Sequence, residues 1–140
     1  MEYLGIPAAS LAAWIFGVIW YTGFSRQWLA AIESDKDSLG KRPRPINPMI
    51  GSVLAELVLA AGLSYVLDRM SVVGWHWGGM CGLIIGLFVV TPTIFVNYLF
   101  PGRKMMLTLI DAGHWLCVFT IMGVILGFVS GIDFRALRTG

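Results

Sequence analysis

The chain has 140 residues, of which 57% are hydrophobic and 13% are charged, and its formal net charge is +2. A soluble domain of this length would need far more charged surface, so the composition excludes an ordinary soluble protein. Residues 3–25, 70–102 and 112–132 contain no Asp, Glu, Lys or Arg, and residues 46–67 contain only Glu56. Each stretch can cross a bilayer as a helix, which predicts an integral membrane protein.

The fold we predict is all-α: four transmembrane helices form an antiparallel bundle, and residues 1–140 form a single transmembrane domain. The long stretches are apolar on every side, whereas strands of a membrane barrel would alternate apolar and polar residues. After the first span, Trp28, Leu29 and Ile32 recur at helical spacing, which predicts a short helix lying in the membrane interface. The expected spans are about residues 3–24, 46–67, 77–100 and 105–132.

The segment 25–45 is expected to be a cytoplasmic loop between the first two spans. Its residues 41–44, KRPR, fit a solvated and proline-rich loop, and the alternative is a patch that binds anionic lipid. Asn47 and Pro48 then predict the start of the second span, because Asn is a favoured cap and Pro a favoured first helical residue.

Glycines recur at every fourth residue in the last two spans and predict close helix packing. Such stripes let the backbones of two membrane helices approach each other. Continued at helical spacing, the stripe of the third span passes through Thr93 and Asn97. The stripe of the fourth span projects away from Asp111 and is expected to meet a neighbouring helix, of this chain or of another subunit. The two stripes are Gly78, Gly82 and Gly86, and Gly123, Gly127 and Gly131.

Pro92 interrupts the third span. Proline has no backbone N–H and its ring conflicts with the carbonyl four residues earlier, so we expect a kink and a Phe88 carbonyl without its helical partner. Thr91 and Thr93 flank this point, and their hydroxyls are expected to supply the missing hydrogen bond.

The basic residues are divided unevenly between the two sides of the bundle. With four spans, both termini lie on the same side as the turn at Arg69, and this side carries three basic residues against seven on the other. The positive-inside rule therefore predicts that residues 25–45 and 101–104 are cytoplasmic and that both termini are outside.

A layer of polar side chains is predicted in the cytoplasmic half of the bilayer. At a rise of about 1.5 Å per residue, Glu56 lies roughly 15 Å into the second span, and Asp111 and His114 lie roughly 9 and 13 Å into the fourth. Asp111 and His114 share one helix face, which is expected to point toward Glu56 and Asn97. The candidate site residues are Glu56, Thr93, Asn97, Thr108, Asp111 and His114.

This layer is compatible with two kinds of role. An isolated charge at such a depth costs at least about 2.5–3.5 kcal/mol, so the acids must be protonated or paired. Two acids and a histidine that share protons can form a proton relay, a cation site or a ligand site. The alternative is a clamp of interhelical hydrogen bonds that only fixes packing. Zinc or manganese accept such ligands, but Asp-x-x-His with a distant Glu is a weak pattern, so we predict no metal and no cofactor.

Two motifs resemble a family of small four-span bacterial membrane proteins, domain of unknown function 1761. IWYTGF followed by SRQW is similar to its first motif, and NYLFPGRK followed by TLIDAGHWL is similar to its second. The resemblance singles out Trp20, Tyr21, Trp28, Asn97 and residues 111–114. It implies a multi-pass protein of the bacterial inner (plasma) membrane and implies no activity.

Two functions follow as hypotheses. The first is proton-linked transport or binding of a small solute at Glu56, Asp111 and His114, in an oligomer whose interface is formed by the glycine stripes. The alternative is a non-catalytic accessory or assembly subunit of a membrane complex. An enzyme is not favoured, because the chain lacks CxxC, HExxH and GxSxG motifs. The expected partners are the lipid bilayer and either further copies of the chain or a larger membrane complex, and no nucleic acid.

Overall fold

The computed structural model describes residues 2–32 and 47–139, with side chains for 4–32 and 47–132. The expected basic patch at residues 41–44, like the rest of the segment 33–46, lies outside the described residues. The described part of the chain is helical and contains no strand. Its elements are α1 (Glu2–Gly23), α2 (Ser25–Ile32), α4 (Pro48–Arg69), α5 (Trp75–Ile85), a π-helical turn (Gly86–Val90), α6 (Thr91–Leu99) and α7 (Met105–Thr139).

Four helices are long and apolar enough to cross a membrane, which confirms the predicted architecture. The spans are Leu4–Gly23, Pro48–Arg69, Trp75–Leu99 and Met105–Ile132. Many large apolar side chains point outward, among them Val58 and Phe88, which are 72% and 71% exposed. In a soluble protein such a surface would be a liability, but on a membrane helix it faces lipid.

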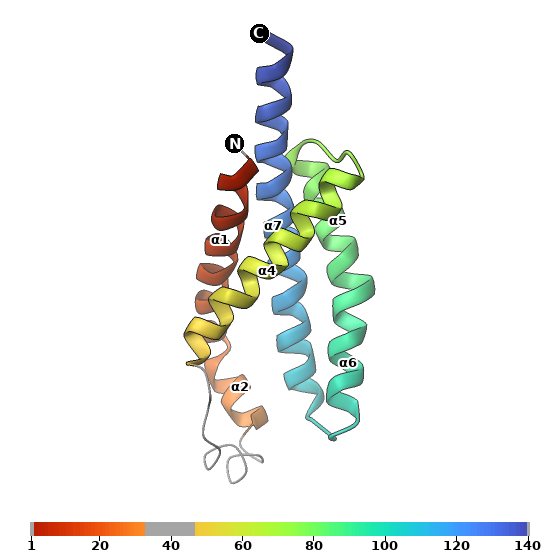
Figure 1. Cartoon of the computed structure of the whole chain (residues 1–140). Coiled ribbons are helices and arrows are strands. Elements are labelled where there is room, and N and C mark those ends of the chain that lie inside the picture. Colours follow the sequence, from red (N-terminus) through yellow and green to blue (C-terminus); the bar gives the residue numbers. More distant parts are fainter. Residues whose placement is uncertain (1, 33–46, 140) are drawn as a thin grey trace.

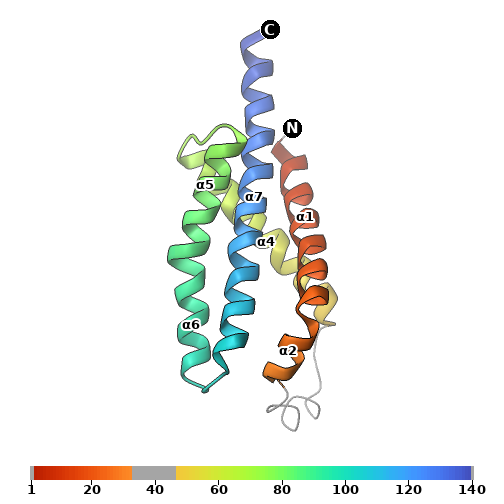
Figure 2. The same ribbon diagram turned by 180° about the vertical axis from the view of Figure 1, so that it is seen from behind.

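Helix α7 is the central element of the bundle and contacts all the other described helices. It lies between α1 on one side and the continuous rod of α5 and α6 on the other, while α4 crosses the bundle obliquely (Figures 1 and 2). Both ends of the chain lie at the same end of the bundle, and α2 lies at the opposite end (Figure 1). Val118 and Met122 of α7 are fully buried and form the centre of the apolar core.

Local sequence explains where α4 begins. The Asn47 side chain accepts a hydrogen bond of 2.9 Å from the backbone N–H of Met49, and Pro48 is the first helical residue. The predicted cap is therefore present. The short helix after the first span is present as α2, and Trp28 on it packs against Tyr21 with ring centroids 5.8 Å apart.

The two glycine stripes meet each other along the contact between α5 and α7. A Cβ atom on Gly78 would overlap the carbonyl oxygen of Gly123, and one on Gly82 would overlap that of Phe119. The backbones are close enough for the N–H of Gly74 to donate to the carbonyl of Gly127 at 3.0 Å. The stripes are thus occupied within one chain, and the expectation that they form the interface of an oligomer is wrong.

The structure accommodates Pro92 differently from the predicted kink. The helix widens into the π-helical turn Gly86–Val90 just before the proline, so both the backbone N–H and the hydroxyl of Thr91 donate to the carbonyl of Gly86. The hydroxyl of Thr93 donates to Val89 rather than to Phe88. A π turn contains one more residue than an α turn, and it separates the proline ring from the carbonyl it would strike.

Candidate functional site

The carboxylate of Asp111 joins three helices. Its Oδ1 accepts a hydrogen bond of 2.8 Å from the hydroxyl of Tyr21 on α1, and its Oδ2 accepts one of 2.7 Å from the hydroxyl of Tyr98 on α6. Asp111 itself is only 6% exposed. Both carboxylate oxygens therefore have a partner, as a buried acid requires. We call Asp111 with its two donors, Tyr21 and Tyr98, the Asp111 clamp.

A second contact beside this clamp ties α1 to α7. The indole N–H of Trp20 donates to the backbone carbonyl of Ile110 at 3.1 Å. The approach depends on Gly113, because a Cβ atom there would lie 3.2 Å from the Trp20 ring. Trp20 and Tyr21 thus both hold the C-terminal end of α1 against the first turns of α7.

His114 lies one turn beyond Asp111 and is enclosed by aromatic rings. Its ring centroid is 4.8 Å from that of Tyr21 and 5.2 Å from that of Trp115, and the ring of Phe16 stacks on it at 6.1 Å. The side chain is 4% exposed, yet neither ring nitrogen has a hydrogen-bond partner among the described residues. The Nε2 atom faces α1 at Gly17, where a Cβ atom would lie only 3.0 Å away.

Glu56 contributes a third polar group, from α4. It is 4% exposed, and its Oε2 atom is buried without a hydrogen-bond partner in the part of the chain that the structure describes. Leaving a buried polar atom unpaired costs about 1–3 kcal/mol, and more if it is charged. A chain that retains such a group in its core usually does so for a purpose beyond stability.

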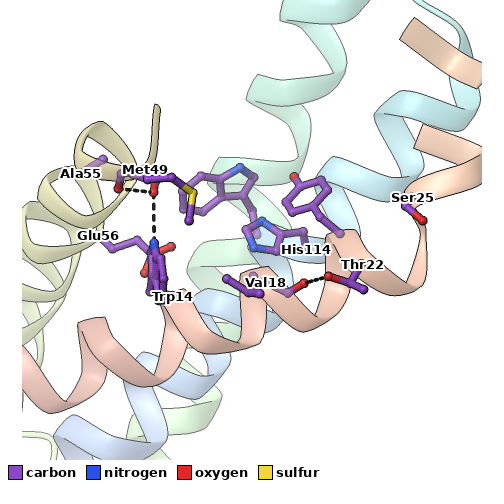
Figure 3. Close-up of a pocket in the computed structure, with 12 residues that line it drawn as sticks. Trp14, Val18, Thr22, Ser25, Met49, Ala55, Glu56 and His114 are labelled. Carbon is purple, nitrogen blue, oxygen red and sulfur yellow. Dashed lines mark hydrogen bonds between the residues drawn. The ribbon is translucent and has the colours of Figure 1, made fainter. Parts of the chain in front are cut away.

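Glu56 and His114 line one cavity of about 600 Å³ between α1, α4 and α7. Figure 3 shows both residues at its wall, with Trp14 on α1 below Glu56. Much of the remaining lining is apolar or aromatic and includes Tyr21 and Trp115. The cavity opens at the surface of the bundle, because lining residues such as Val18, Met49 and Ala55 are exposed.

The remaining candidates of the predicted layer are divided. Thr108, three residues before Asp111 on α7, is buried, whereas Thr93 and Asn97 on α6 are exposed and are not the donors to Asp111. The π turn explains this difference, because one extra residue rotates the following helix by about 100°. Ile94 and Tyr98 therefore lie on the face of α6 that continues the glycine stripe of α5, where a regular helix would place Thr93 and Asn97. Both side chains are half-buried.

The arrangement does not form a metal centre within the described residues, where no group of three His, Cys, Asp or Glu side chains lies close enough to hold an ion. Asp111 is engaged by tyrosine hydroxyls, so it is not paired with His114 as the sequence pattern implied. The site is a cavity, open at the surface of the bundle, with two polar side chains that have unpaired buried atoms among the described residues. Such an arrangement suits an organic molecule or proton exchange.

Comparison with known proteins gives the family and nothing further. A family model described as "Protein of unknown function (DUF1761)" matches residues 4–127. The chain belongs to this family. No curated protein and no solved structure matches it. The match with DUF1761 includes both the Asp111 clamp and the residues that line the cavity, so neither feature lies on an addition to the family's domain.

Several residues of the site in this DUF1761 chain were not predicted as site residues. Tyr21 was singled out only through the resemblance, and Tyr98 could not be placed without knowledge of the π turn. The cavity wall is formed by aromatic side chains, which are difficult to distinguish from ordinary core residues in a membrane protein. The residues not predicted from the sequence are Trp14 and Trp115, which line the cavity, Phe16, which stacks on His114, and Tyr98, which donates to Asp111.

Proposed function

We propose that this membrane protein binds a small solute in the cavity between α1, α4 and α7, and that binding is linked to proton exchange at Glu56 and His114. The observation that carries the proposal is the cavity of about 600 Å³ whose wall includes two buried polar side chains without partners among the described residues. Ligand cavities in proteins are typically of about 300–1,000 Å³, mostly apolar, with a few polar groups that fix orientation.

The proposal extends to transport if the cavity is reached from both sides of the membrane. Four helices enclose little space, so we propose that transport requires a homo-oligomer or a larger membrane complex. The glycine stripes are already occupied within the chain, so the interface would use the outer faces of the other helices. The distribution of basic residues supports a plasma-membrane protein, as in bacteria, with both termini outside.

The proposal is tested by screening the purified protein against a set of solutes that covers amino acids, amines, sugars, carboxylates, nucleosides and alcohols. The wild type and the double variant Glu56→Gln/His114→Phe are compared in detergent micelles by thermal unfolding. We expect at least one class to raise the unfolding midpoint of the wild type and to lose this effect in the variant. The proposal fails if no class raises the midpoint, or if every increase persists in the variant.

A second candidate function is a non-catalytic accessory subunit whose polar layer fixes helix packing. The fully paired carboxylate of Asp111 favours it for that part of the layer. It predicts that the chain is isolated from native membranes together with a larger complex, that Asp111 variants lose this association, and that Glu56 variants keep it. Purification under mild conditions followed by mass spectrometry of the associated proteins measures this directly.

A further inference from the structure

Most of the side-chain hydrogen-bond donors around the cavity are engaged within the protein. Several donors that line it are already engaged: the indole N–H of Trp14 donates to Ser52, and the hydroxyl of Ser52 donates to the carbonyl of Met49. The hydroxyl of Thr22 donates to Val18, and that of Tyr21 donates to Asp111. Figure 3 shows the bonds of Trp14 and Thr22 along the wall. Among the described lining residues, the donors without a partner are the hydroxyl of Ser25, the indole N–H of Trp115 and the N–H of a neutral His114.

The buried unpaired groups among the described residues are Glu56 and His114. An ionised carboxylate only accepts hydrogen bonds, and a neutral imidazole offers one acceptor nitrogen and one N–H donor. A charged imidazolium among aromatic rings, without an acceptor, would be an unpaired buried charge, which is costly. No Lys or Arg among the described residues lines the cavity, so an anionic ligand would find no counter-charge in this part of the chain. The site therefore suits a ligand that is positively charged and carries N–H groups.

The aromatic residues of the wall favour the same kind of ligand. Trp14, Tyr21 and Trp115 line the cavity together with Glu56. Indole and phenol faces attract cations by about 0.5–1 kcal/mol when exposed and by about 2 kcal/mol or more when water is excluded. The apolar remainder of the lining, which includes Val18 and Met49, suits a hydrocarbon body rather than a sugar.

We propose that the ligand of this cavity is a primary or secondary ammonium compound with an apolar body, held by the Glu56 carboxylate and by the acceptor nitrogen of His114 between the rings of Trp14, Tyr21 and Trp115. This inference rests on the proposed function and narrows its ligand to one chemical class. A trimethylated ammonium keeps its positive charge for the Glu56 carboxylate and the aromatic rings. It has no N–H to donate to His114, so it binds more weakly.

Proton exchange follows from the charges around Glu56. The titratable side chains that face the cavity are Glu56, His114 and Tyr21. Asp111 is held by two tyrosines, and α5, which also contacts α4, carries no Asp, Glu, Lys or Arg. The ammonium group binds the ionised form of Glu56, so a protonated Glu56 releases its proton as the ligand enters. Binding therefore weakens as the pH falls.

The test uses the purified full-length chain in neutral detergent and isothermal titration with matched probes. The cation is 2-phenylethylamine, its neutral counterpart is 2-phenylethanol, its anionic counterpart is 3-phenylpropanoate, and its N-methylated counterpart is phenethyltrimethylammonium. We expect 2-phenylethylamine to bind at least about 10-fold more tightly than the other three. Glu56→Gln should abolish this preference, whereas Gly62→Ala, a change on the same helix with nothing within 4 Å, should leave it intact.

The outcomes separate this inference from the proposed function. If the alcohol or the carboxylate binds as well as the amine, or if no probe binds, the ammonium assignment is overturned. The proposed function still stands if another solute class raises the unfolding midpoint of the wild type and not that of the Glu56→Gln/His114→Phe variant. If the trimethylated compound binds as tightly as the amine, the role of His114 as acceptor is overturned. A preference that persists in Glu56→Gln would reflect detergent partitioning and would also overturn the assignment.

The ammonium could belong to a free amine or to a lipid headgroup, and one further arm distinguishes these sources. Phosphatidylethanolamine carries a primary ammonium and phosphatidylcholine a trimethylated one. If phosphatidylethanolamine displaces 2-phenylethylamine and phosphatidylcholine does not, the ammonium of a lipid occupies the cavity. If neither lipid displaces the amine, the ligand is a free amine.

Discussion

Asp111 and Glu56 are both buried acids inside the bundle, 6% and 4% exposed, yet their surroundings are opposite. Asp111 accepts hydrogen bonds from two tyrosines on two different helices. Glu56 has a buried oxygen without any partner among the described residues and borders a cavity. The first acid is satisfied within the protein, whereas the buried oxygen of the second finds no partner in the described part of the chain.

This difference changes what a polar layer in a membrane protein means. Depth alone assigns both acids to one site, but their hydrogen bonds separate a carboxylate that is paired within the protein from one that has an unpaired buried oxygen among the described residues. A paired group stabilises the helix arrangement, whereas an unpaired group costs stability until a ligand or a proton compensates it. The comparison therefore predicts opposite signs for substitutions at the two acids.

The largest effect is expected for Asp111→Ala. This change removes two interhelical hydrogen bonds and leaves two tyrosine hydroxyls without their acceptor, so unfolding should become easier by about 2–3 kcal/mol. Equilibrium unfolding in mixed micelles measures it. Asp111→Asn, which keeps one carbonyl acceptor, should lose about half as much. A loss below about 0.5 kcal/mol for Asp111→Ala would mean that the clamp contributes nothing to stability.

The next effect concerns the donors of the clamp. Tyr98→Phe and Tyr21→Phe each remove one hydroxyl and should each reduce the free energy of unfolding by about 1 kcal/mol. Because the hydroxyls act through the same carboxylate, combining either change with Asp111→Ala should cost little more than Asp111→Ala alone. A double-mutant cycle with additive losses would show that the tyrosines act elsewhere.

The opposite sign is expected at Glu56. Glu56→Leu replaces an unpaired polar group by an apolar one of similar size and should raise the free energy of unfolding by about 1 kcal/mol. Glu56→Gln, which keeps a polar group, should change it by less than about 0.5 kcal/mol. The same unfolding assay applies. A clear loss of stability in both variants would place Glu56 in the structural class with Asp111.

The smallest effect is expected at Gly17. A Cβ atom there would lie 3.0 Å from His114 Nε2, so Gly17→Ala should push the imidazole by a few tenths of an ångström and change stability by only about 0.5 kcal/mol. Binding of 2-phenylethylamine should weaken several-fold. Gly23→Ala on the same helix, with nothing within 4 Å, is the matched control. Equal binding by both variants would argue against a contact between His114 and the ligand.

The architecture could be predicted from sequence because the signals for it are local. Uninterrupted apolar stretches determine the spans, and Asn47 with Pro48 determines the start of α4. Close helix packing at each glycine stripe also follows from spacing, but that the two stripes pack against each other within one chain does not. Such a choice depends on how helices far apart in sequence come together.

The site was harder to predict because it depends on the rotation of α6 about its axis and on which buried polar groups lack a hydrogen-bond partner. The stripe through Thr93 and Asn97 assumed a regular α-helix, and the π turn before Pro92 rotates Tyr98 inward instead. Whether Asp111 or Glu56 lacks a partner depends on residues contributed by α1 and α6. Neither the rotation of Tyr98 nor the pairing of the two acids can be predicted from the residue spacing in α4 and α7, the helices that carry the acids.

The π turn also shows how the third span could lose one residue without losing the clamp. A π turn holds one more residue than a regular α-helix needs, so deleting one residue between Gly86 and Val90 would leave a regular helix in which Tyr98 still faces Asp111. The glycine contact before the turn and the clamp after it would both persist. Homologues that are one residue shorter in this segment are therefore expected to keep the donor for the acid of α7 at the position that aligns with Tyr98, with a one-residue gap at the π turn.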